Sequence, residues 1–361
     1  MPTVSLCMIV KDEEDTLERC LESVHDLVDE IIIVDTGSKD KTKDIARRYT
    51  ENIFDFPWID DFSAARNYSF EQATMEYIFW LDADDVLLPK DRENFKQLLA
   101  TLDPRIDAVM MKYNIAFDEQ GNVTFSYLRE RLVKRACNFK WREPVHEYLE
   151  IDGQIFITDI GITHLKNRSP APGRNLAIYE KLLAQGKQLS PRGLYYYARE
   201  LKDNERYDKA IDYFQQFLDS GQGWYEDCIN ACLELARCYA DKKEYRKSLE
   251  ALFKSFTYDL PRAEACCELG YHYKNLGDLV KAIFWFELAT QLTKPENSWG
   301  FIQEDYWGII PCLELCCCYY QLGNLEKAIE YNEKAEKIKP NDPSVLYNKE
   351  FFASIRQQDK T

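Results

Sequence analysis

The sequence predicts an α/β domain with a mostly parallel sheet over residues 1–174, followed by an all-α domain over residues 175–361. Strand-like and helix-like patterns alternate through about the first 120 residues, which predicts a parallel sheet with helices on both faces. After Arg174 the strand patterns disappear and helical periodicity dominates. The chain has 361 residues, 45% of them hydrophobic, which is enough for two hydrophobic cores.

In the first domain, short apolar runs are separated by helical patterns. Residues 4–10, 31–34, 52–56, 77–81 and 108–117 have the length and composition of strands. Helices are expected at residues 17–24, 41–49, 62–73 and 89–102, and a hairpin turn at residues 118–122. This alternation of strands and helices is typical of a chain in which helices form the crossover connections between parallel strands.

Three carboxylates follow the fourth predicted strand. Residues 78–81 are apolar, and Asp82, Asp84 and Asp85 come directly after them. Open α/β sheets bind ligands at the carboxyl ends of their strands. Asp82 and Asp84 lie on the same side of an extended chain, so both can face one cation, and carboxylates suit Mg²⁺ or Mn²⁺. The sequence therefore predicts a divalent-metal site that carries a diphosphate, with a solvated acidic turn as the alternative.

The charge balance argues against a nucleic-acid partner. The chain has 46 Lys and Arg against 62 Asp and Glu, a net charge of −16. Residues 1–174 hold 22 basic and 33 acidic residues (net −11), and the remainder holds 24 and 29 (net −5). A protein that binds nucleic acid has a basic surface. In so acidic a first domain, an anionic substrate needs a cation.

Cysteine usage and hydropathy predict a cytoplasmic location. The chain has twelve Cys but no pair of C-x-x-C motifs of the kind that binds zinc. Many unpaired thiols are typical of a reducing compartment. The N-terminus lacks the pattern of a signal peptide, and no apolar run approaches the ~20 residues that span a bilayer.

The second domain contains an internal repeat. Lysines at positions 209, 247, 281 and 327, each followed by Ala or Ser, lie 38, 34 and 46 residues apart. Aromatic-rich helical segments such as residues 194–198 and 269–273 precede them. The pattern resembles the tetratricopeptide repeat, whose period is about 34 residues. We expect stacked helical hairpins in which small residues such as Ala210 and Ala282 let the paired helices approach each other.

Four segments of the first domain together resemble the family 2 glycosyltransferases, which have the GT-A (nucleotide-diphospho-sugar transferase) fold. They are residues 4–13 (VSLCMIVKDE), 33–42 (IVDTGSKDKT), 61–67 (DFSAARN) and 81–85 (LDADD). The glycine-rich motifs of other nucleotide-binding folds are missing from the sequence. A fifth segment, residues 141–147 (WREPVHE), is similar to a subset of this family with C-terminal tetratricopeptide repeats, which includes the peptide S-glycosyltransferases of glycosylated bacteriocins.

The resemblance implies which residues bind the donor. Val10, Lys11 and Asp35 would contact the nucleobase, and Arg66 would pair with the base or a phosphate. Asp82 would contact the ribose or the metal. Two of these residues also have a structural interpretation, since Asp35 could cap the next turn and Arg66 could be a surface ion-pair residue.

The resemblance also implies a metal site. Asp84 would ligate the metal together with Asp82, and the late His164 would complete the shell. A packed histidine at a strand end is the alternative for His164. The basic segment 129–135 could meet the diphosphate, but we expect it to be the solvated face of two strands.

Family 2 enzymes resemble one another in inverting the anomeric centre by direct displacement, which requires a base for the acceptor proton. We favour Glu147 as this base, with His146 and Glu143 as alternates. The H-E-x-x-H metalloprotease pattern fails because Glu150 stands where its second His should be. A structural hydrogen bond between His146 and Glu147 is the other interpretation.

These features predict an inverting, metal-dependent glycosyltransferase that uses Mg²⁺ or Mn²⁺ and a nucleoside-diphosphate sugar, with a UDP-sugar favoured. The acceptor is expected to be a peptide or protein, at a Cys or Ser side chain, because helical repeats bind extended peptides. The alternatives are a transferase of cell-surface polysaccharide synthesis and a repeat scaffold with an inactive transferase domain. The repeats are also expected to mediate self-association, as a homodimer, or docking of the acceptor, if aromatic residues such as Trp285, Trp299 and Trp307 are exposed.

Overall fold

The computed structural model describes residues 1–117, 121, 123–165, 172–295 and 303–358. The chain forms two compact units, Met1–Lys187 and Gln188–Thr361. The expected hairpin turn, apart from Gly121, and Trp299 lie outside the described residues.

The boundary between the units follows Lys187 rather than Arg174, because helix α5 (Arg174–Ala184) packs on the first unit. The hydroxyl of Tyr179 donates to the carbonyl of Val145 at 3.5 Å, and Lys181 forms an ion pair with Asp60. The expected boundary at residue 174 lies 13 residues before this division and stays a prediction, because the helical period of α5 does not reveal which unit the helix contacts.

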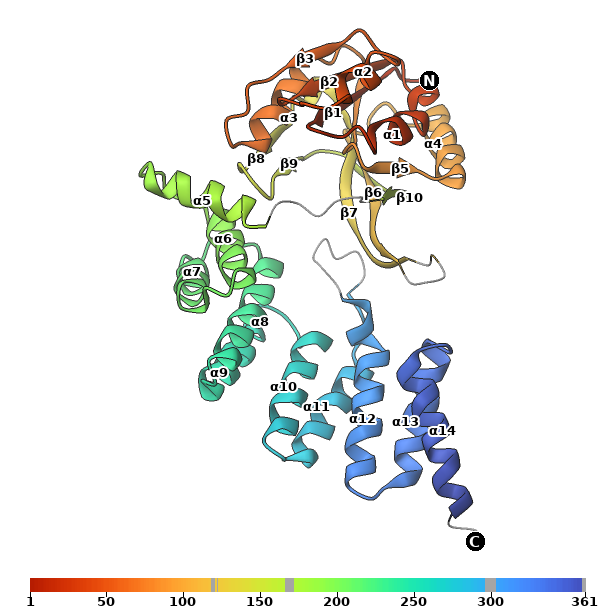
Figure 1. Cartoon of the computed structure of the whole chain (residues 1–361), viewed down its shortest axis with the longest axis vertical. Helices are drawn as coiled ribbons and strands as arrows, with labels where there is room; N and C mark the ends of the chain where they lie inside the picture. Colours follow the sequence, from red (N-terminus) through yellow and green to blue (C-terminus); the bar gives the residue numbers. More distant parts are fainter. Residues whose placement is uncertain (118–120, 122, 166–171, 296–302, 359–361) are drawn as a thin grey trace. The chain divides into compact units, whose positions relative to one another are not determined.

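The first unit is built on an eight-stranded sheet with helices on its faces (Figure 1). Its strands are β1 (Val4–Val10), β2 (Glu30–Asp35), β3 (Ile53–Asp55), β4 (Tyr77–Trp80), β5 (Asp85–Leu87), β6 (Ala108–Phe117), β7 (Val123–Lys134) and β10 (Ile155–His164). A separate ribbon consists of β8 (Lys140–Arg142) and β9 (Tyr148–Glu150). The helices are α1 (Leu17–Glu22), α2 (Thr42–Ala46), α3 (Phe62–Glu71), α4 (Pro89–Thr101) and α5, with 3-10 turns η1 (His25–Leu27) and η2 (Arg135–Cys137).

The strand order is β3-β2-β1-β4-β7-β6-β10-β5. Strand β1 runs parallel to both β2 and β4, and β2 runs parallel to β3. Strand β7 is antiparallel to β4 and β6, β10 is parallel to β6, and β5 is antiparallel to β10. The chain winds outward from β1 to β3 and then returns to β4 on the other side of β1. That reversal is the topological switch point at which open α/β sheets form their ligand crevice.

Alternate residues of the central strands fill two hydrophobic cores. Leu6 and Met8 of β1 belong to the core on one face of the sheet, and Cys7 belongs to the core on the other face. In β4, Phe79 and Trp80 divide between the faces in the same way. Successive side chains of a strand point to opposite faces, so a strand buried on both sides reads as a continuous apolar run.

The second unit is entirely helical in its described residues (Figure 1). Its helices are α6 (Pro191–Asp203), α7 (Tyr207–Asp219), α8 (Tyr225–Asp241), α9 (Tyr245–Ser255), α10 (Ala263–Asn275), α11 (Leu279–Gln291), α12 (Ile309–Gln321), α13 (Leu325–Ile338) and α14 (Pro343–Gln358), with a 3-10 turn η3 (Glu304–Trp307). Helices α6 and α7, α8 and α9, α10 and α11, and α12 and α13 pack as pairs. Ala210 and Ala282 are fully buried, as expected for residues where paired helices approach closely. The expected fold class, α/β followed by helical repeats, is confirmed.

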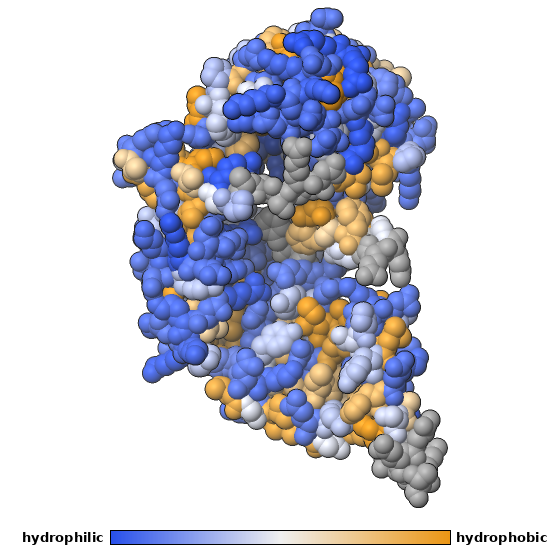
Figure 2. Space-filling view, viewed as in Figure 1, coloured by the Kyte–Doolittle hydropathy of each residue, from blue (hydrophilic) through white to orange (hydrophobic). Residues whose placement is uncertain are grey.

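Figure 2 shows mainly hydrophilic residues on the visible surface, with hydrophobic residues scattered among them. Trp285 is partly buried against Phe253 and Phe256, and the indole nitrogen of the partly buried Trp307 donates to Glu264 at 3.0 Å. The expected homodimer relied on these tryptophans being exposed, so it stays a prediction with a weaker basis. Within the described ranges, no helix is both long enough and apolar enough to cross a membrane.

Candidate functional site

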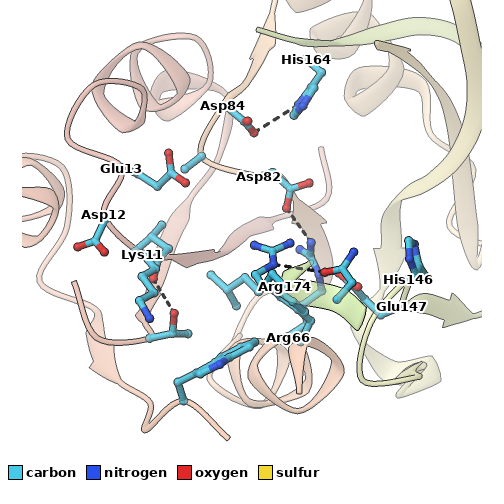
Figure 3. Close-up of a pocket in the computed structure, with 17 residues that line it drawn as sticks. Lys11, Asp12, Glu13, Arg66, Asp82, Asp84, His146, Glu147, His164 and Arg174 are labelled. Carbon is cyan, nitrogen blue, oxygen red and sulfur yellow. Dashed lines mark hydrogen bonds and ion pairs between the residues drawn. The ribbon is translucent and has the colours of Figure 1, made fainter. Parts of the chain in front are cut away.

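A cavity of about 560 Å³ opens at the carboxyl ends of β1 and β4 in the first unit (Figure 3). Its lining comes from segments distant in sequence: the end of β1, helix α3, the loop after β4, the loop before β9, the end of β10 and the start of α5. The cavity therefore lies where the reversal of strand order predicts a ligand site.

Most of the residues predicted from the sequence line this cavity. They are Val10, Lys11, Arg66, Asp82, Asp84, His146, Glu147 and His164. Asp35 and Glu143 do not line it. The fold thus gathers eight of the ten predicted residues in one place, while the role of each one stays a prediction.

Asp35, which was predicted to contact the nucleobase, has a structural role in the turn after β2. Its carboxylate is buried and accepts hydrogen bonds from the backbone N–H groups of Gly37 and Ser38 at 3.1 Å. It therefore caps the turn after β2, which is the alternative that the sequence left open. The next residue, Thr36, lines the cavity instead, and its hydroxyl donates to the carbonyl of Val10 at 3.1 Å.

The loop that carries the candidate base has an unusual backbone. Glu143 and His146 both have positive φ angles, of 71° and 53°. Few residues other than glycine adopt this conformation, and such strain concentrates at functional sites. The loop turns Glu147 into the cavity and leaves Glu143 outside its lining, so Glu143 is the weakest of the three candidate bases.

Two carboxylates and an imidazole form the candidate metal centre. Nδ1 of His164 lies 3.3 Å from Oδ1 of Asp84 and 3.2 Å from Oδ1 of Asp85. Together these residues offer ligand atoms that all lie within 4.8 Å of one another. The predicted ligands were Asp82, Asp84 and His164. The structure places Asp85 beside Asp84 and His164, whereas Oδ1 of Asp82 accepts a hydrogen bond from Arg66, and the choice of ligands stays a prediction.

Strand pairing explains why the centre forms. Strand β5 begins at Asp85 and runs antiparallel to β10, with Asp85 opposite His164. The backbone N–H of Leu165 also donates to the carbonyl of Asp84 at 2.9 Å. Asp84 and His164 are therefore fixed by backbone hydrogen bonds, although 80 positions separate them in the sequence.

Asp85 and Arg131 form a buried ion pair beneath this centre. Both side chains are fully buried, and Nη1 of Arg131 lies 2.9 Å from Oδ2 of Asp85. The guanidinium carbon of Arg131 lies 3.9 Å from the ring centre of Trp80 and 4.3 Å from that of Tyr113. The sequence predicted a solvated face for residues 129–135. That prediction was wrong for Arg131, because this end of β7 is buried on both faces and a charged residue gives no sequence sign of burial.

The electrostatics of the centre favour a cation. Burial lowers the pKa of His164, but hydrogen bonds to Asp84 and Asp85 outweigh burial and raise this pKa to about 10. The hydroxyl of Tyr113 also contacts Nδ1 of His164, at 2.9 Å. The carboxylates thus hold positive charge on the imidazole, at the place where a divalent ion would supply it.

Arg66 of helix α3 occupies the middle of the cavity wall and is buried. Its Nη2 donates to Oδ1 of Asp82 at 2.7 Å, and its Nε donates to Oε1 of Glu147 at 2.8 Å (Figure 3). Burial lowers the pKa of Arg66, but Asp82 and Glu147 outweigh it and raise the pKa. Burial raises the pKa of Asp82, but Arg66 and Arg131 outweigh it and lower the pKa to about 2.

Other residues line the cavity without having been predicted. Trp58 and Phe62 lie edge to face with ring centres 4.7 Å apart, and Arg174 lies 4.9 Å from the ring of Phe62. Figure 3 shows Arg174 on the same side of the cavity as Arg66 and Glu147. Their sequence signal was weak, because Trp58 lies in an irregular segment and Arg174 begins a helix that the sequence placed at a domain boundary.

Comparison with known families defines the class of protein. Residues 5–150 match glycosyl transferase family 2, and residues 195–264, 263–295 and 312–342 match tetratricopeptide repeats. The chain therefore carries a family 2 glycosyltransferase domain followed by tetratricopeptide repeats, and both resemblances seen in the sequence are confirmed.

Two curated relatives show which known proteins the chain is similar to. A TPR repeat-containing protein of Synechococcus elongatus is 40% identical over 150 residues, which are 42% of this chain and 36% of that protein. The SPbeta prophage-derived glycosyltransferase SunS of Bacillus subtilis is 29% identical over 238 residues, 61% of this chain and 54% of that protein. The chain thus spans about a third and about half of the length of these two relatives.

Proposed function

We propose that this chain is an inverting, metal-dependent glycosyltransferase that moves a sugar from a nucleoside-diphosphate sugar, favouring a UDP-sugar, to a peptide or protein. The observation that carries the proposal is the cluster of Asp84, Asp85 and His164 at the carboxyl end of β4, within a domain that matches glycosyl transferase family 2. The carboxylates of this cavity would repel a bound diphosphate unless a cation lay between the carboxylates and the diphosphate.

The residues present fit Mg²⁺ or Mn²⁺. Asp84 and His164 are partly exposed at the cavity, with 22% and 21% of their side-chain surfaces accessible, so both can reach an ion. Carboxylate oxygens suit both ions, and an imidazole nitrogen is an additional ligand for Mn²⁺. When bound, the ion would act as a Lewis acid that stabilises the charge of the departing nucleoside diphosphate. Asp85 is fully buried and paired with Arg131, so we assign it to orienting His164 rather than to direct ligation.

On the acceptor side, Glu147 is the proposed base. Its Oε1 is held by Arg66, while its Oε2 has no hydrogen-bond partner within the part of the chain that the structure describes. In the proposed reaction the acceptor atom bonds to the anomeric carbon, the bond to the diphosphate oxygen breaks, and the acceptor proton passes to Glu147. A positioned base of this kind contributes about 10²–10⁴-fold to the rate.

The acceptor assignment has separate support. Tetratricopeptide repeats present extended surfaces to which peptides bind. The similarity to glycosyltransferase SunS extends over 61% of this chain, whereas residues 5–150 account for the whole of the family 2 match. A peptide or protein acceptor, at a Cys or Ser side chain, is therefore favoured over a polysaccharide.

Binding and turnover of sugar nucleotides test this proposal. We expect Mn²⁺ together with UDP to stabilise the protein against heat by about 2.7 kcal/mol at a hundredfold excess over Kd, and UDP alone to stabilise it much less. A hydrolysis screen across UDP- and GDP-sugars then identifies the donor. A protein that shows neither a metal-dependent shift nor hydrolysis with any sugar nucleotide is not the enzyme proposed here, and the scaffold alternative would then apply.

A further inference from the structure

The side chain of Arg66 joins two sides of the cavity that the sequence keeps far apart. Asp82 follows β4, and Glu147 precedes β9. Arg66 donates to one carboxylate through Nη2 and to the other through Nε, at 2.7 and 2.8 Å. Two donors of one planar guanidinium therefore set the separation of two carboxylates whose proposed tasks differ, since Asp82 lies on the donor side and Glu147 is the proposed base.

Two tryptophans fix the plane of this guanidinium. The guanidinium carbon of Arg66 lies 4.8 Å from the ring centres of both Trp80 and Trp141. The two indoles are themselves in edge-to-face contact, with ring centres 4.7 Å apart. Arg66 is only 8% exposed, so its position is fixed when the protein folds. Contacts of a cation with aromatic faces strengthen when the site excludes water.

Each carboxylate retains one oxygen for the reaction. Oδ2 of Asp82 and Oε2 of Glu147 have no hydrogen-bond partner among the residues that the structure describes, and both residues line the cavity. The predicted role of Arg66, direct contact with the nucleobase or a phosphate, stays a prediction, and the structure shows Nε and Nη2 bound to the two carboxylates.

We propose that Arg66 is a positioning residue that aligns the donor-side carboxylate Asp82 with the acceptor-side base Glu147. The inference rests on the proposed function and adds a coupling to it: a single side chain sets both the binding of the donor and the approach of the base. A planar fork is required, because a lysine ammonium at the same place is a point charge and does not fix two carboxylates in one plane. Displacement of a reacting group by 1 Å can cost about 10²-fold in rate.

The matched pair Arg66→Lys and Arg129→Lys tests the proposal. Arg129 also lies over Trp80 and Trp141, at 5.0 and 5.9 Å, but its ion pair is with Glu130 and it does not line the cavity. For Arg66→Lys we expect at least a tenfold weaker binding of UDP in the presence of Mn²⁺ and about a 10²-fold lower kcat for sugar-nucleotide turnover. Glu147→Gln should lower kcat alone. Arg129→Lys keeps the charge beside the same indoles without bonding either carboxylate, so it should lose at least tenfold less than Arg66→Lys in both measurements.

Crystal structures separate failure of this inference from failure of the proposed function. In Arg66→Lys, and in Arg66→Gln if the lysine variant does not fold, we expect the carboxylate of Glu147 to leave its wild-type position by more than about 1 Å. An unmoved Glu147 in either variant overturns the positioning role, whether or not the protein transfers sugar. Loss of UDP binding with an unchanged kcat would mean that Arg66 acts on Asp82 alone, which also overturns the coupling. A wild-type protein that turns over no sugar nucleotide counts against the proposed function instead.

Discussion

The buried ion pair between Arg131 and Asp85 makes Arg131→Met the most informative perturbation of the first unit. Neither side chain has accessible surface, and the 2.9 Å contact is between full charges. Methionine fills much of the space between Trp80 and Tyr113 but leaves the carboxylate of Asp85 buried without its arginine partner. Among the described residues, Asp85 would then retain the backbone N–H of Asp82 at 3.0 Å and Nδ1 of His164 at 3.2 Å.

Removal of one partner from a buried pair costs about 3–5 kcal/mol, because the remaining charge is uncompensated. Nε and Nη2 of Arg131 have no hydrogen-bond partner in the described part of the chain. Arg131 therefore contributes its cation–π contacts, its contact with Asp85 and a hydrogen bond from Nη1 to the carbonyl of Trp80 at 3.2 Å. A typical domain is stable by about 5–15 kcal/mol. We therefore expect the variant to fold but to be close to the limit of stability.

Native-state hydrogen exchange measures this loss within one unit of a two-unit chain. The slowest amides of β4 and β7 should exchange about 10²- to 10⁴-fold faster in Arg131→Met, at about 1.4 kcal/mol per factor of ten. The double variant Arg131→Met, Asp85→Asn removes both charges and should recover most of the protection. An increase of less than tenfold in the single variant, or no recovery in the double variant, would refute the argument that the charge of Asp85 dominates this region.

Three further predictions follow from individual side chains. Asp84→Ala should abolish both Mn²⁺ binding, measured by calorimetry, and sugar transfer without changing the melting temperature. Alanine at the exposed Asp44 should change neither Mn²⁺ binding nor sugar transfer. Wild-type Mn²⁺ affinity in Asp84→Ala would remove the metal site proposed here. Gly270→Ala places a methyl group 2.6 Å from the buried ring of Phe286, so it should destabilise the repeat unit by about 1–3 kcal/mol despite the better helix propensity of alanine. Phe286→Leu in the same chain should restore part of the loss. A variant that urea unfolding shows to be stabilised would contradict the steric overlap. Burial raises the pKa of Asp227 to about 6 against the opposing effect of Arg192 and Arg199, so the folded state binds the proton more tightly than the unfolded state. The free energy of unfolding should therefore fall by up to about 3 kcal/mol as pH rises from about 4 to 6. Hydrogen exchange of α8 should show this pH dependence, and an equal dependence in Asp227→Asn would assign it to another group.

Local patterns in the sequence were sufficient for most of the fold. Strands β1 and β6 have the bounds that apolar runs predicted at residues 4–10 and 108–117, because strands buried on both faces are apolar throughout. No bounds were predicted for β5, β7, β8, β9 and β10. Of these, β5, β8 and β9 have three residues each, which is too short for alternation to appear.

The site was predictable to the extent that it depends on residue type and order. Carboxylates directly after an apolar run indicated a ligand site, and Asp84 and His164 do lie together at the cavity. The sequence could not distinguish Asp82 from Asp85 as the neighbour of His164. That choice depends on the antiparallel pairing of β5 with β10, which places Asp85 opposite His164.

The sequence by itself determined that a parallel sheet precedes helical repeats, because hydrophobic periodicity is a local property of the chain. It also indicated which side chains are candidates to bind a metal and a diphosphate, because that depends on chemical type. Only the tertiary structure decided that Asp35 caps a turn, that Arg131 neutralises Asp85, and that Arg66 connects Asp82 to Glu147. These three assignments depend on contacts between residues that are brought together by strand order and burial, and a charged residue in a sequence carries no sign of whether it will be buried or which opposite charge it will meet.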